Sequence, residues 1–271
     1  MLKGTNVGIQ IRKLYEPKLY PEAKLHEIFE KYFKRNEKSL PFICSVGFEP
    51  NPSHEETLKK LSKAYQGCDW NVKIFTKTAV SDQDGQAYFY TDHEPEKLEW
   101  GGNIIGKSNN HQWLSHLKQC FYVSCFFGEF LEPVSHSKGR FRLNKDTSGQ
   151  LVKRTKLSDF IHQKVATRAI PHLDPIQHGQ PKVLIKMDIE GSEVEVIPNL
   201  IYSQSFDFID VILVEFHNFL NQKKRKVESD WLRFFTQDYT YLYNLVQNRS
   251  IEIFDFDDES YHLSNYSLPK C

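Results

Sequence analysis

The segment from Val183 to Glu193 constrains the fold more than any other part of the 271-residue chain. Its apolar start, Val183 to Ile185, predicts the end of a buried strand. Two carboxylates, Asp188 and Glu190, follow where that strand should leave the sheet. Ligands bind outside the carboxyl ends of the strands in open α/β sheets, so we expect these side chains, Asp188 above all, to face a ligand.

A helix is predicted to start directly after these carboxylates. Gly191 allows a sharp turn, and Ser192 with Glu195 has the spacing of a helix capping box. The alternative interpretation is a solvated acidic helix start, which the helix dipole favours. That alternative explains Glu193 and Glu195 well, but it explains Asp188 poorly because Asp188 follows an apolar strand.

Strands and helices alternate along most of the chain. Apolar runs closed by turn-forming or polar residues predict strands at 42–48, 72–80, 183–188 and 208–215. Apolar residues at helical spacing and capping signals predict helices at 21–33, 53–65 and 157–164, and a short helix that ends before Pro198. This alternation predicts an α/β fold with a doubly wound, mainly parallel sheet and helices on both of its faces.

Two regions depart from that alternation. Residues 91–150 are rich in His, Asn, Gly and aromatic residues, and we interpret them as an insertion, with a strand or two, that covers a pocket. Near the other end, 239–246 and 250–256 predict a closing antiparallel pair of strands. The sequence has no internal repeats, and we expect a single domain over residues 1–271.

Composition excludes several classes of function. Lys and Arg number 35, as do Asp and Glu, so no net charge favours binding to nucleic acid. No apolar stretch has the length of a membrane span and the N-terminus has no signal-peptide core, so a cytoplasmic location is favoured for the chain as given. Five scattered cysteines without a CxxC pair indicate neither a zinc site nor a disulfide framework, and we expect Cys44, in an apolar run, to be buried.

Three further positions are candidates for ligand contact. Glu49 ends the first clear strand, where an acidic residue often holds the hydroxyls of a ribose, although an ordinary exit into a turn fits equally well. Glycines in Gly4 to Gly8 let a backbone pass close to a ligand, although a frayed terminus is the alternative. His217 follows the strand at 208–215 and has the chemistry of a general base, but a structural histidine is slightly favoured.

Taken together, these segments resemble the FkbM-type methyltransferases, a branch of the class I S-adenosylmethionine-dependent enzymes. The resemblance covers most of the chain and rests on residues 4–8, 47–52, 78–82, 157–160, 185–193 and 214–217. The most specific of these blocks are Phe48 to Pro52 and Lys186 to Glu193. Such enzymes have a Rossmann-like fold and transfer a methyl group from S-adenosylmethionine, usually to a hydroxyl oxygen.

The resemblance also implies roles for single residues on the cofactor side. Gly4, Asn6 and Gly8 would approach the methionine part of S-adenosylmethionine. Glu49 would hold the ribose hydroxyls, with Asn51 of the same motif also at the cofactor.

Further along the chain, Ser81 and Asp82 would lie beside the adenine. Asp188 and Glu190 would stand near the sulfonium and the acceptor, with His217 on the substrate side. Asp188 is the first candidate to accept the proton of the acceptor hydroxyl, with Glu190 or His217 next. No spacing of His and Asp supports a metal, and we expect none.

One departure from the family pattern bears on activity. The first motif of the family carries an acidic residue two positions before its first glycine, where this chain has Leu2. We therefore expect the first strand of the sheet to be missing or truncated. A truncated or catalytically inactive methyltransferase-like binding module is the main rival interpretation. A nucleotide-cofactor oxidoreductase is a second rival, against which the absence of G-x-G-x-x-G argues.

Overall fold

The structure is a computed structural model that describes residues 7–33, 40–91, 102–105, 149–169, 181–190, 192–215, 251–256 and 267–269. Its α-helices are α1 (Ile9–Tyr15), α2 (Leu25–Phe33), α3 (Glu55–Gly67), α5 (Leu157–Phe160) and α7 (Glu193–Tyr202). Its strands are β1 (Cys44–Glu49), β2 (Asn71–Thr76), β3 (Thr78–Ser81), β4 (Gly85–Thr91), β5 (Gly102–Ile105), β6 (Gln150–Lys156), β7 (Leu184–Met187), β8 (Val211–Val214) and β9 (Glu252–Asp255). Short helical turns complete the set, at Pro17–Leu19, Leu40–Phe42, Pro52–His54, Ile161–Val165 and Ser205–Phe208.

The strands form three sheets. β1 pairs with β2 in parallel, and β7, β8 and β9 form a second parallel sheet in that order. The third sheet has the order β3-β6-β4-β5, in which β3 is parallel to β6 while β4 is antiparallel to both of its neighbours. The predicted α/β class with parallel sheets and helices is therefore confirmed, but these strands are not joined into one continuous sheet.

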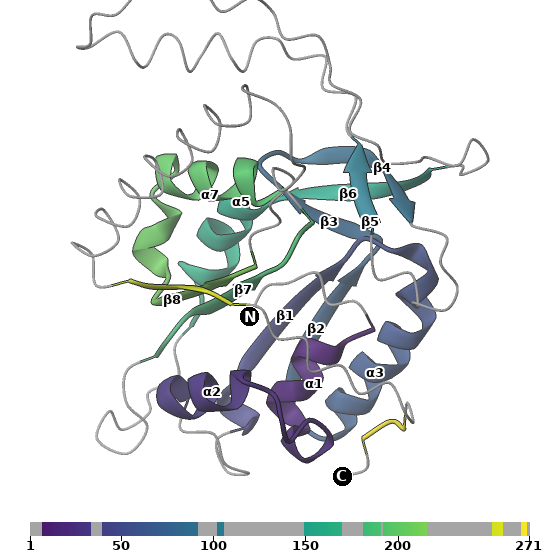
Figure 1. The fold of residues 1–271 in the computed structure, drawn as a ribbon, viewed down its shortest axis with the longest axis vertical. Helices are drawn as coiled ribbons and strands as arrows, with labels where there is room; N and C mark the ends of the chain where they lie inside the picture. Colours follow the sequence, from purple (N-terminus) through teal and green to yellow (C-terminus); the bar gives the residue numbers. More distant parts are fainter. Residues whose placement is uncertain are drawn as a thin grey trace, which may run out of the picture.

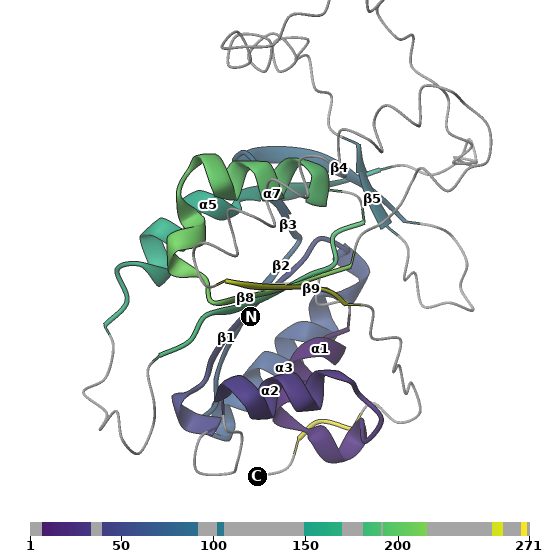
Figure 2. The same cartoon turned by 60° about the vertical axis from the view of Figure 1, so that its left-hand side comes forward.

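Helices cover both faces of the parallel strands, as Figures 1 and 2 show. The side chains of β8 alternate between the two faces, as expected for a strand buried on both sides. Ile212 and Val214 belong to the core cluster that contains the buried residues of α5 and α7. Val211 and Leu213 belong to the cluster formed with α1, α2 and α3. β7 lies between the same two layers, because Ile185 and Met187 belong to the first cluster and Leu184 to the second.

The predicted strand at 72–80 is broken into two strands by Lys77. Its φ of 50° lies in the left-handed region, which turns the chain from β2 into β3 and so from one sheet into another. The Lys77 carbonyl accepts from the Lys153 N–H at 2.9 Å, and its ammonium lies 2.6 Å from Glu55 Oε2. A single residue, Lys77, therefore connects two strands that belong to different sheets, a connection that usually takes a loop.

Both predicted helix starts differ in detail. Neither capping box forms: Ser192 makes no side-chain cap to α7, and the turn before α3 is capped by Asn51 rather than by Ser53. The helix predicted to end before Pro198 instead runs on to Tyr202. A proline removes only one backbone donor, and here the buried face of α7 outweighs that loss.

The cysteines also differ from the expectation. Cys44 is exposed, because the alternation of β1 turns Ser45 inward instead. Cys68, at the end of α3, is disulfide-bonded, although the cysteine spacing indicated no disulfide framework.

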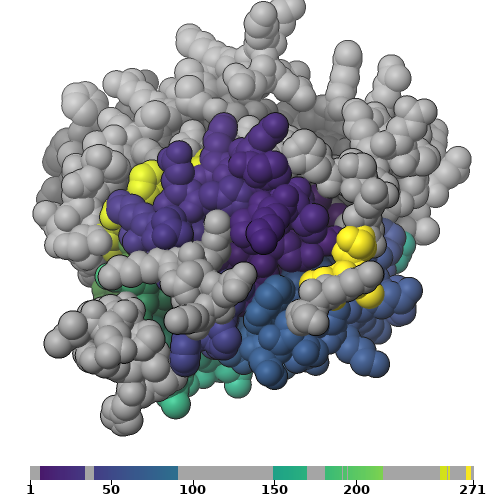
Figure 3. Space-filling model, turned by 90° about the horizontal axis from the view of Figure 1, so that it is seen from below, coloured from purple at the N-terminus to yellow at the C-terminus, as the bar shows by residue number. Residues whose placement is uncertain are grey.

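The C-terminal residues contact the N-terminal helix. Figure 3 shows residues 267–269 (yellow) against the N-terminal helices (purple) and α3 (blue), and Arg12 Nη2 donates to the Ser267 carbonyl at 2.8 Å. Of the predicted closing pair, β9 runs parallel to β8, whereas 239–246 lies outside the described residues. The pocket-covering role assigned to 91–150 falls largely outside them too, although β5 and β6 come from its two ends. None of the described helices combines the length and the apolar character that a membrane span needs.

Candidate functional site

Glu49 is the last residue of β1 and is buried, with 4% of its surface exposed. Pro50 ends the strand, and the chain then turns so that the Asn51 N–H donates to Glu49 Oε1 at 2.9 Å. The same oxygen lies 3.4 Å from His54 Nδ1. A backbone donor thus fixes one carboxylate oxygen of Glu49, and the buried imidazole lies beside that oxygen without a hydrogen bond to it.

Asn51 is occupied with the turn that follows. Its Oδ1 accepts from the Ser53 N–H at 3.0 Å and from Ser53 Oγ at 2.8 Å. This is the geometry of a helix cap, and it orients the start of α3 behind Glu49. The structure therefore gives Asn51 a positioning role, and its direct cofactor contact stays a prediction.

Of the three candidate residues in the N-terminal glycine motif, only Gly8 is described. Its φ is 90°, a conformation that a residue with a Cβ rarely adopts, and it stands immediately before α1. The Gly8 carbonyl accepts from the Arg12 N–H at 2.9 Å, which starts the helix. Gly4 and Asn6 lie outside the described residues.

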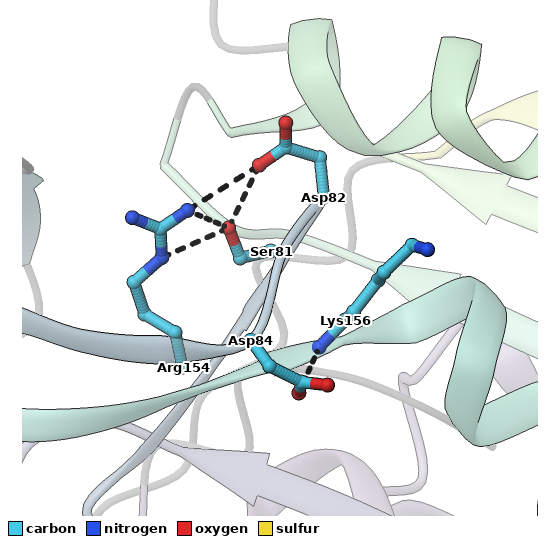
Figure 4. A network of polar contacts seen from close by, with 5 residues as sticks. All are labelled: Ser81, Asp82, Asp84, Arg154 and Lys156. Carbon is cyan, nitrogen blue, oxygen red and sulfur yellow. Dashed lines mark hydrogen bonds and ion pairs between the residues drawn. The ribbon is translucent and has the colours of Figure 1, made fainter. Parts of the chain in front are cut away.

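Ser81 and Asp82 lie at the end of β3, and both are held by a residue that the sequence did not single out (Figure 4). Arg154 Nη2 lies 2.9 Å from Ser81 Oγ and 3.4 Å from Asp82 Oδ1, and Ser81 Oγ donates to that Asp82 oxygen at 3.0 Å. Arg154 belongs to β6, which was not predicted as a strand.

Asp188 and Glu190 lie in the tight turn between β7 and α7, and both are half-buried. Glu190 has a φ of 52°, so the chain already turns sharply one residue before Gly191, which lies outside the described residues. The buried Glu193 carboxylate accepts from the Ile189 N–H at 2.9 Å, and this hydrogen bond links the two ends of the turn. Glu193 is thus structural, but it is buried and not solvated as the acidic helix-start interpretation expected.

A buried lysine adjoins this turn on the other face of β7. Lys186 is 0% exposed; its ammonium donates to the Phe256 carbonyl at 2.8 Å and lies 3.4 Å from Glu215 Oε2. The Glu215 N–H donates to the Met187 carbonyl at 2.8 Å, so the ends of β7 and β8 stay side by side. His217, two residues further on, lies outside the described residues.

Several of the predicted residues share one end of the structure. The residues just inside Glu49, Ser81 and Asp188, which are Phe48, Val80 and Met187, belong to one core cluster. Partial desolvation raises the pKa of the Glu195 carboxyl; the negative charge of Asp82 raises it further, whereas the positive charge of Arg154 lowers it. These influences join the end of β3 to the first turn of α7. Among the described residues, no group of three or more His, Cys, Asp or Glu side chains is placed to hold a metal.

The arrangement offers buried or half-buried oxygen acceptors from three strand ends, and it suits a ligand rich in hydroxyl and amino groups. The family model of the methyltransferase FkbM domain matches residues 29–243, which include the ends of β1, β3 and β7. Neither a curated protein nor a solved structure matched the chain.

Proposed function

The chain belongs to the FkbM methyltransferase family, and from that premise we propose that it transfers a methyl group from S-adenosylmethionine to a hydroxyl oxygen. The acceptor that we propose is a small molecule or a glycan-like compound. The observation that carries the proposal is the buried carboxylate of Glu49 at the carboxyl end of a parallel strand.

The residues around Glu49 fit the ribose of such a cofactor. The Asn51 N–H donates to Oε1, and a carboxylate has further lone pairs that can accept from a ribose hydroxyl. Hydrogen bonds to a charged acceptor are about twice as strong as neutral ones, and burial excludes the water that would compete for them. Ser81 and Asp82 would line the adenine side, and Gly8 would allow a close backbone approach on the methionine side.

The chemical step asks little of the protein beyond alignment and proton transfer. When bound, S-adenosylmethionine supplies a methyl group that is already activated on a sulfonium. The half-buried turn at Asp188 would then hold the acceptor hydroxyl in line and keep water out. Asp188 is the residue that we propose as the proton acceptor, with Glu190 and His217 as the next candidates.

Calorimetric titration of the protein with S-adenosylmethionine and S-adenosylhomocysteine tests this proposal. We expect both ligands to bind with micromolar dissociation constants, and NADH and NADPH, titrated in parallel, not to bind. Tight binding of a nicotinamide cofactor instead would support an oxidoreductase. A folded protein that binds none of the four ligands would contradict the proposed cofactor.

Binding alone does not separate an enzyme from an inactive binding module. A screen of hydroxylated acceptors with S-adenosylmethionine labelled in its methyl group makes that distinction. Incorporation of label into any acceptor supports a transferase. Cofactor binding without transfer to sugars, glycosides or small alcohols would favour the binding-module alternative.

A further inference from the structure

Arg154 lies in the middle of the mixed sheet. Its strand, β6, runs between β3 and β4, and the backbone of Arg154 is in register with Ala79 on one side and Gly85 on the other. From there its side chain reaches two residues along β3 toward Ser81 (Figure 4). The turn from Ser81 to Gly85, which joins β3 to β4, therefore lies next to Arg154, the residue that holds it in place.

The guanidinium makes three contacts at that turn. Nε and Nη2 lie 3.2 and 2.9 Å from Ser81 Oγ, and Nη2 lies 3.4 Å from Asp82 Oδ1. The side chains of Arg154 and Asp82 are only 14% and 12% exposed, so water screens this ion pair less than a surface pair. On the far side of the turn, Asp84 Oδ1 accepts from the Lys156 N–H at 3.0 Å. Strand β6 thus anchors both ends of the turn.

We propose that Arg154 is a positioning residue that holds Ser81 and Asp82 in the geometry that recognises the adenine of the cofactor. This inference rests on the proposed function, because it assigns Ser81 and Asp82 to the adenine side. Arg154 acts through these two residues and touches no reacting atom. Its contribution is to set the direction of the Asp82 carboxylate, which can accept a hydrogen bond from the amino group of adenine.

The geometry explains why the residue is an arginine. A guanidinium presents several N–H groups in a rigid plane, so one side chain can hold a hydroxyl and a carboxylate together. A lysine ammonium in that place would supply the charge but not the fixed fork. The positive charge also lowers the pKa of Glu195, which the Asp82 charge raises.

Two variants of Arg154 and one control test the inference. Arg154→Gln removes the charge and most of the fork, whereas Arg154→Lys keeps the charge alone. Lys153→Gln is the matched control, because Lys153 neighbours Arg154 on β6 but is exposed. Each protein is titrated with S-adenosylhomocysteine and with its analogue that carries hypoxanthine in place of adenine, and thermal unfolding checks the fold.

Wild type and Lys153→Gln should bind S-adenosylhomocysteine at least about tenfold more tightly than the hypoxanthine analogue, because that analogue sets an acceptor against Asp82. Arg154→Gln should bind S-adenosylhomocysteine about tenfold more weakly and lose most of that preference. Arg154→Lys should retain an intermediate preference. A general loss of structure would weaken the binding of both ligands equally. The ratio of the affinity for S-adenosylhomocysteine to that for the hypoxanthine analogue therefore isolates the positioning role.

The possible failures are distinguishable. If wild type binds neither ligand, the proposed function fails. If wild type binds and discriminates, and folded Arg154→Gln does the same, the role of Arg154 is overturned while the proposed function stands. Should Arg154→Gln not fold, an undiminished preference in Arg154→Lys would overturn the fork argument, and a reduced one would support it.

Discussion

Asp188 is the first residue after the last buried side chain of β7, and its half-buried carboxylate stands at the mouth of a tight turn. We expect Asp188→Asn to lower the rate of methyl transfer by about 100-fold or more, because an amide cannot accept the proton of the acceptor hydroxyl. The replacement is isosteric, so the unfolding midpoint should stay close to that of wild type.

The rate measurement needs a matched control. Asp207→Asn makes the same chemical change at an exposed residue far along the chain from the turn, and it should leave turnover unchanged. Wild-type turnover by Asp188→Asn would show that Asp188 is not the proton acceptor. Glu190 and His217 would then be the remaining candidates.

Glu49 allows a separate prediction about cofactor affinity. Glu49→Ala should weaken the binding of S-adenosylhomocysteine by about 1–3 kcal/mol, because charge-assisted hydrogen bonds to the ribose are lost. Calorimetry measures this difference directly. Glu56→Ala, which shortens an exposed glutamate on the next helix, should bind as wild type does. Equal affinity of Glu49→Ala and wild type would exclude Glu49 from the cofactor site.

At the scale of elements, the turn before α3 depends on one side chain. Asn51 accepts from Ser53 at two atoms and so caps the short helix that leads into α3. Asn51→Ala should lower the free energy of unfolding by about 1 kcal/mol, the usual effect of losing a cap. Asn51→Asp keeps a capping oxygen and should lose less. Urea unfolding measures both, and equal losses in the two variants would contradict the capping role.

The same scale shows which elements the sequence could predict. β1, β7 and β8 were recognised because strands buried on both faces are continuous apolar runs. β6 was missed because Lys153, Arg154 and Lys156 interrupt its apolar residues. Val152 is the one residue of Leu151 to Lys156 that belongs to an apolar core cluster. The break at Lys77 has no local signal, since nothing in a lysine indicates a positive φ.

The candidate site divides in the same way. Glu49 and Asp188 were found because they stand where strands end, whereas Ser81 and Asp82 were found through the family resemblance. The structure places all four at strand ends. Arg154 reaches that site from a neighbouring strand 73 positions away in sequence. A contact of that kind depends on which strands pair, and periodicity within one segment carries no information about pairing.

At the scale of the whole molecule, buried polar groups tie the N-terminal helix to the rest. Tyr65 of α3 donates to Glu16, which accepts from Arg12 of α1 at 2.8 Å. Tyr15 donates to the Ile43 carbonyl at 2.8 Å, next to β1. These contacts fasten α1 to α3 and to the segment that leads into β1.

The buried phenols predict a loss of stability at alkaline pH. Burial raises the pKa of Tyr65 well above its ordinary value of 10, and it raises the pKa of Tyr15 as well. The unfolded chain releases these protons near pH 10, whereas the folded protein keeps them. The free energy of unfolding should therefore be undiminished below pH 10 and fall above it, by about 1.4 kcal/mol per pH unit for each phenol.

Urea unfolding between pH 8 and pH 11 measures that slope. The variant with both Tyr15→Phe and Tyr65→Phe should show a shallower decline, with a remainder from Tyr20, whose pKa burial also raises. A slope equal to that of wild type would mean that other groups control alkaline unfolding.

Lys77 has a mechanical consequence for the molecule. Holding a residue with a side chain in the left-handed region costs about 1–2 kcal/mol, and the contacts of Lys77 with α3 and β6 counteract its relaxation. A loop would let the sheets on either side of it tilt independently. A single anchored residue couples the two sheets rigidly. A change in the twist of the sheet that carries Ser81 is therefore transmitted to β2, the strand that pairs with β1 and lies beside Glu49.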